Sequence, residues 1–144
     1  MSIMYQFLDR STVTLSAPHH FLIVSARIWA LSAAFQRCAF STLAPRFDKL
    51  GLLDTLPHFH TLMGILNTES LWRLELAPPC RETIDDDEAM LLNLIEAAAE
   101  GGAGLHRTAE ALVGDTPALA ALVDTARRVV AEVSAAGPLR DQTS

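Results

Sequence analysis

Apolar residues recur at helical spacing along most of the chain, and the clearest example follows residue 116. Thr116 can cap a helix whose first position is Pro117, where a missing N–H costs little. Gly137 and Pro138 then close it. The apolar positions predict one buried face, made of Leu119, Leu122, Val123, Ala126, Val130 and Val133.

Two further helices are predicted just before this one. Asp85 can cap a helix, with Glu88 as its capping-box partner three residues later, and Gly101-Gly102 ends it. A shorter helix follows and stops at Gly114. The first of the two should bury Ala89, Leu92, Ile95 and Ala99 and expose Asn93, Glu96 and Glu100.

The first half of the chain predicts a long central helix, capped by Ser16 and running to about Thr42. It should end there because Pro45 disfavours helical geometry at the preceding residue. Its apolar run, 21–35, contains Arg27 and is shorter than the roughly 20 residues that a membrane span needs. We therefore expect a helix buried in a bundle or covered by a second subunit, with Cys38 in the core.

Shorter segments complete the predicted fold. A helical turn or two at 47–50 and a helix over 55–67 follow the long helix, and alternation at Trp72–Leu76 indicates one short extended segment. A strand cannot satisfy its backbone groups alone, so it should pair with the N-terminal segment, a loop or its copy in a second subunit. We predict an all-α bundle of about five helices with this one extended segment.

Length and composition favour a single domain. Residues 16–137 form the predicted helical domain, 1–15 a flexible or short-strand lead, and 138–144 a flexible tail. The net charge of -6 and the single lysine, Lys49, argue against nucleic-acid binding. The two cysteines form no disulfide framework, so reduced thiols in the cytoplasm are expected.

The joint between the extended segment and the helix capped by Asp85 is the best candidate for a site. Cys80 precedes a helix N-terminus, which favours thiolate, but acidic neighbours oppose it. An incidental cysteine is therefore the preferred interpretation. The alternative is a small-ligand site here, with Trp72, Cys80, Arg81 and Asp85 as the ligand-binding residues.

Five histidines, His19, His20, His58, His60 and His106, invite a metal hypothesis. On a helix, however, His58 and His60 lie about 200° apart, and no spacing in the chain matches a zinc motif. Nucleotide-binding, hydrolase and paired C-x-x-C motifs are also missing from the sequence. We therefore assign no catalytic residue, metal ligand or cofactor.

Residues 71–92, with Leu-Glu-Leu-Ala-Pro-Pro-Cys before Asp-Asp-Asp-Glu-Ala-Met-Leu-Leu, resemble a segment of a family of small uncharacterised bacterial proteins. In that family an Ala-Pro-Cys joint with further cysteines precedes an acidic helix start. Here Pro79 and Arg81 stand where further cysteines would be, which argues against a metal or redox role. The resemblance covers the second half of the chain and implies a fold at most.

The function expected from the sequence is non-enzymatic. A helix that is apolar around most of its circumference favours a cytoplasmic protein that forms a homodimer and acts through protein contacts, without membrane or nucleic acid. The alternative is a small-ligand or metal-binding protein with its pocket near Cys80 and Asp85. An enzyme would need Cys80, a histidine such as His58 or His60, and a carboxylate to converge.

Overall fold

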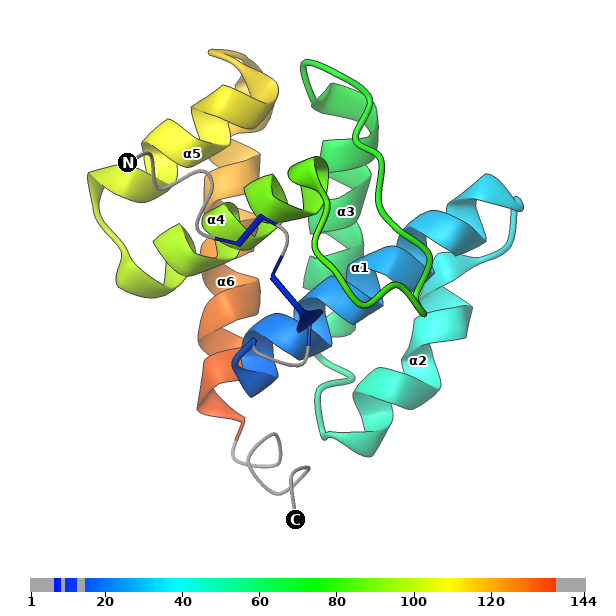
Figure 1. The fold of residues 1–144 in the computed structure, drawn as a ribbon. Coiled ribbons are helices and arrows are strands. Elements are labelled where there is room, and N and C mark those ends of the chain that lie inside the picture. Colours follow the sequence, from blue (N-terminus) through cyan, green and yellow to red (C-terminus); the bar gives the residue numbers. More distant parts are fainter. Residues whose placement is uncertain (1–6, 9, 13–14, 137–144) are drawn as a thin grey trace.

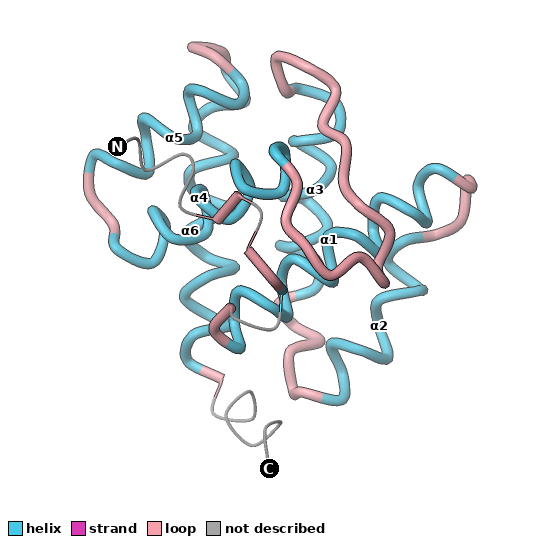
Figure 2. The backbone as a smooth tube through the Cα atoms, viewed as in Figure 1, coloured by secondary structure: helices cyan, strands magenta, loops and turns pink. Residues whose placement is uncertain are grey.

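The computed structural model describes residues 7–8, 10–12 and 15–136, and over these residues the chain is an all-helical bundle (Figures 1 and 2). The predicted tail, and residues 1–6, 9 and 13–14 of the predicted lead, lie outside the described residues. The predicted fold class is confirmed. The helices within the described ranges are α1 (Ala17–Ala34), α2 (Ala39–Lys49), α3 (Leu56–Glu69), α4 (Asp86–Glu100), α5 (Ala103–Val113) and α6 (Pro117–Ala135).

Helix α1 is covered mainly by other helices of the same chain, one of the two arrangements that its apolar circumference predicted. It packs against α2 and α4, while α3 lies between α2 and α6 (Figure 1). Ile23 and Ala26 are fully buried, and Leu22 and Phe21 nearly so. Other helices of the same chain therefore cover most of this helix. Within the described residues, no helix is both long enough and apolar enough to cross a membrane.

The long first helix predicted to reach Thr42 is wrong, because the chain breaks between α1 and α2. Phe35 ends α1, Gln36 adopts a positive φ of 55°, and Cys38 caps α2. Pro45 lies inside α2, so the residue before it is helical after all. The break lets α2 fold back onto α1, where the rings of Phe21 and Phe47 meet edge to face 4.9 Å apart.

Helix α4 is more buried than its sequence pattern predicted. The capping box of Asp85 and Glu88 is present as expected. Asn93, placed on the polar stripe, is only 5% exposed, whereas Ala99, placed on the buried face, is exposed. Since α1, α5 and α6 all pack against α4, Asn93 does not face solvent, while Glu96 is half-buried and Glu100 is exposed as predicted.

The short pairing predicted for the extended segment occurs at a different place. Ser11 and Thr83 form an isolated antiparallel bridge, supported by the N–H of Ile84 donating to the carbonyl of Arg10 at 3.0 Å. The N-terminal segment thus pairs beyond the two prolines, not with 72–76. Within the described residues no strand forms (Figure 2).

Candidate functional site

The connector between α3 and α4, residues 70–85, is held by the acidic first turn of α4. Asp87 accepts the indole N–H of Trp72 at 2.9 Å through Oδ1, and the backbone N–H of Glu75 at 2.7 Å through Oδ2. Glu88 Oε2 accepts the backbone N–H of Ala77 at 3.0 Å. Carboxylate oxygens therefore take the place of a partner strand for these donors.

A buried ion pair between Arg27 of α1 and Glu88 of α4 holds the connector in place. Arg27 Nε lies 2.5 Å from Glu88 Oε2 and its Nη2 lies 2.9 Å from Oε1, and both side chains have no exposed area. The remaining guanidinium donors reach the carbonyls of Arg81 at 2.7 Å and Thr83 at 2.9 Å. Every contact joins α1 to the connector or to α4. In the sequence, Arg27 stands out as a single arginine within an apolar run, but nothing near it in the chain indicates that Glu88 is its partner.

The connector forms one wall of a half-open apolar groove of about 220 Å³. The C-terminal half of α1, one side of α3 and Leu91 of α4 form the rest of it. Its lining combines small alanine side chains, large apolar side chains, one guanidinium and one amide. The lining residues are Trp29, Ala30, Ala33, Ala34, Met63, Leu66, Asn67, Arg73, Leu74, Leu76 and Leu91.

The floor of the groove is fixed by a hydrogen bond between α1 and α3. The indole N–H of Trp29 donates to Nδ1 of His60 at 3.0 Å, and the ring of Phe40 packs edge to face on that imidazole at 5.6 Å. Since Nδ1 accepts, a neutral His60 carries its proton on Nε2. The groove is therefore largely pre-formed.

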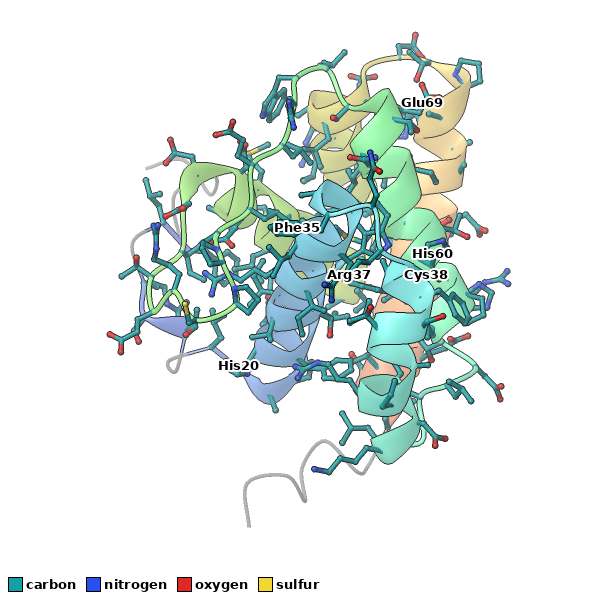
Figure 3. All side chains as sticks on the ribbon, turned by 90° about the vertical axis from the view of Figure 1, so that its right-hand side faces the viewer. His20, Phe35, Arg37, Cys38, His60 and Glu69 are labelled. Carbon is teal, nitrogen blue, oxygen red and sulfur yellow. The ribbon has the colours of Figure 1, made fainter. Side chains whose placement is uncertain are left out.

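Exposed apolar side chains lie at the C-terminal end of α1, on another face of the helix than Ala30, Ala33 and Ala34, which line the groove. Phe35 is 68% exposed and Leu31, one turn earlier on the same helix face, is 44% exposed. Figure 3 looks onto the turn between α1 and α2, where Phe35 and Arg37 lie, with Glu69 at the end of α3 above them. Over the part of the chain that is described, the charges of Arg37, Arg73 and Glu69 have no ion-pair partner.

Of the four residues predicted from the sequence as a ligand site, Arg81 and Asp85 contact each other, whereas Trp72 contacts Asp87, which is not one of the four. Arg81 Nη1 lies 3.3 Å from both carboxylate oxygens of Asp85, and Trp72 is bound to Asp87. Cys80 is exposed and does not line the groove. Ligand binding by these four residues stays a prediction, and the groove is a feature that the sequence did not indicate.

The histidines are dispersed, each against a different part of the bundle. His58 Nε2 lies 4.0 Å from Glu132, and in the described part of the chain no histidine hydrogen-bonds Cys80 or the carboxylates of 85–88. Among the described residues, no group of three or more His, Cys, Asp or Glu side chains is placed so that it could hold a metal ion. Burial, then the charges of Arg46 and Arg27, lower the pKa of His20, which favours its neutral form.

His19 connects two helices through its ring. Its Nδ1 lies 2.6 Å from Oγ of Ser16, the cap of α1, and its Nε2 lies 2.8 Å from Glu96 on α4. The Glu96 carboxylate does not lie along the direction in which an Nε2–H of His19 would point. The contact between Nε2 and Glu96 is therefore electrostatic and not a hydrogen bond. Because Ser16 Oγ also accepts the backbone N–H of His19 at 3.4 Å, we interpret the group as a helix cap.

Cys38 is exposed, which corrects its predicted place in the core. It caps α2, and its sulfur accepts the hydroxyl of Ser41 at 3.3 Å and the backbone N–H of Ser41 at 3.5 Å. These two hydrogen bonds, the hydroxyl's first, lower the pKa of the Cys38 thiol.

Because the thiolate is the reactive form, we expect Cys38 to be alkylated roughly two to ten times faster at pH 7 than Cys80. The described residues give the Cys80 sulfur no hydrogen-bond donor. Single Cys80→Ser and Cys38→Ser variants isolate each thiol for iodoacetamide labelling followed by mass spectrometry. Adding Ser41→Ala to Cys80→Ser should slow the Cys38 reaction; an unchanged rate would show that Ser41 does not stabilise the thiolate.

Comparison with known proteins returned no match to the chain among family models, curated proteins or solved structures.

Proposed function

We propose that this protein is a non-enzymatic interaction module that self-associates through the surface at the end of α1. The observation that carries the proposal is the exposure of Phe35 and Leu31 on one face of the C-terminal end of α1. Large apolar side chains grouped on an exposed surface are typical of protein contact sites. The rest of α1 is covered within the chain, so this end is the part left for a partner.

The chemistry of the described residues also favours binding over catalysis. An enzyme at the joint would need a histidine near Cys80, and the described histidines contact other parts of the bundle. Two free thiols, Cys38 and Cys80, support the proposed cytoplasmic location.

Wild-type protein at micromolar concentration should give a dimer mass, about twice 15.6 kDa, by light scattering. Phe35→Glu should shift the mass to that of the monomer, because a charge would have to be desolvated in the contact. Leu53→Glu is the matched control, since Leu53 is also an exposed apolar residue, 43% exposed, but lies between α2 and α3. A monomeric wild type would overturn the proposal.

A further inference from the structure

We propose that the groove between α1, α3 and the connector binds a small aromatic monocarboxylate, with the ring against the apolar lining and the carboxylate on Arg73. This site goes beyond the proposed self-association, because Phe35 and Leu31 lie on another face of α1 than the alanines that line the groove. The size of the groove, the rigidity of its walls and the charge in its lining support the inference.

The groove has room for an aromatic ring and a short acidic side chain. An apolar cavity of about 150 Å³ is enough to hold benzene. The groove offers about 220 Å³, so space remains beside a phenyl ring for a carboxylate and a short methylene linker. Because the groove is half-open, the charged end of such a ligand can keep part of its contact with water.

The apolar walls are in place before a ligand enters. Met63, Leu66 and Leu91 line the groove and are almost completely buried, and Trp29 is held by its hydrogen bond to His60. Indole and thioether side chains both make favourable contacts with an aromatic ring. A ring also has fewer rotatable bonds to immobilise than an alkyl chain of the same size. The lining therefore favours an aromatic ligand.

Arg73 makes the groove complementary to an anion. Among the described residues it is the one charged residue in the lining, and its guanidinium has no ion-pair partner there. A guanidinium presents paired N–H donors that match the two oxygens of a carboxylate. Asn67 adds an amide to the same lining as a further hydrogen-bond donor.

The backbone around Arg73 is anchored by the first turn of α4. Asp87 accepts the indole N–H of Trp72 on one side of Arg73 and the backbone N–H of Glu75 on the other. Both Asp87 oxygens are thereby engaged by the connector. The guanidinium is therefore carried on a fixed segment, and its positive charge remains available to a ligand.

The test compares 3-phenylpropionate with its neutral amide, 3-phenylpropionamide, by isothermal titration calorimetry at pH 7. Wild-type protein should bind the acid at one site per chain with a dissociation constant below about 1 mM. The amide should bind at least tenfold more weakly, since it lacks the charge that Arg73 recognises. A dimeric wild type that fails to bind the acid would overturn this inference and leave the proposed self-association intact.

Arg73→Gln should weaken binding of the acid at least tenfold and leave binding of the amide unchanged. Arg37→Gln is the matched control. Arg37 is also exposed and without an ion-pair partner among the described residues, but it lies in the turn between α1 and α2 and does not line the groove (Figure 3). Equal weakening by the two variants would overturn the proposal, because it would reflect net charge alone.

Ala33→Trp should abolish binding of both compounds by filling the groove. Ala33 lines the groove and is exposed, so the larger side chain can be added without displacing the core. Ala34, exposed in the same lining, provides Ala34→Trp as a second filler should Ala33→Trp lower the melting temperature. Binding of the acid that survives both substitutions would place its site elsewhere and overturn the proposal.

Discussion

Glu88→Gln is expected to lower the free energy of unfolding by about 3–5 kcal/mol, the cost of leaving one buried charge without its partner. The substitution keeps the size of the side chain but removes the charge that neutralises Arg27. Both side chains of this pair have no exposed area, so water cannot replace the lost carboxylate. Urea denaturation followed by circular dichroism measures the change.

Glu100→Gln is the matched control, because Glu100 lies exposed at the end of the same helix. It should change stability by less than about 0.5 kcal/mol. If Glu88→Gln and Glu100→Gln had equal effects, the Arg27–Glu88 pair would not be the buried contact described here.

The double variant Arg27→Met with Glu88→Gln should be less destabilised than the sum of the two single variants, since no charge is left unpaired. It should still fall below wild type. The carbonyls of Arg81 and Thr83 would lose the guanidinium donors that satisfy them. A strictly additive result would mean that the two side chains do not act as one unit.

Leu122→Ala is expected to lower the free energy of unfolding by roughly 2–5 kcal/mol through the cavity it leaves. Leu122 is fully buried on α6, which packs against α3, α4 and α5, so the surroundings have little freedom to collapse into the space. Thermal and urea unfolding of the variant give the value.

Asp124→Ala, two residues further along α6, should change stability by less than about 0.5 kcal/mol, since the Asp124 side chain is 69% exposed. Its 4.0 Å contact with Arg128 is a surface ion pair of small energetic value. If Asp124→Ala lowered the free energy of unfolding more than Leu122→Ala, the face of α6 described as buried would be the wrong one.

Which features were predictable depends on how far apart in the chain their causes lie. The capping box at Asp85, the start of α6 at Pro117 and its buried face are local: a cap acts within one turn and an apolar period within one helix. The burial of most of α1 followed from its apolar circumference. The sequence by itself determined these properties.

The break after Ala34 could not be predicted, since it contains neither glycine nor proline. It forms because α2 buries its apolar face by folding back onto α1, and that gain outweighs the positive φ of Gln36 and a proline inside α2. For the same reason Asn93 was wrongly placed on the exposed stripe of α4: other helices surround it.

The candidate site is a product of the tertiary structure alone. Arg27 and Glu88 are 61 residues apart, and only packing decides that they meet and replace a partner strand for the connector. The groove is assembled from α1, α3, the connector and Leu91 of α4, segments whose local patterns carry no information about one another. Local spacing determined which faces are apolar; the packing of distant segments determined that Phe35 stays exposed and that a groove is left between the helices.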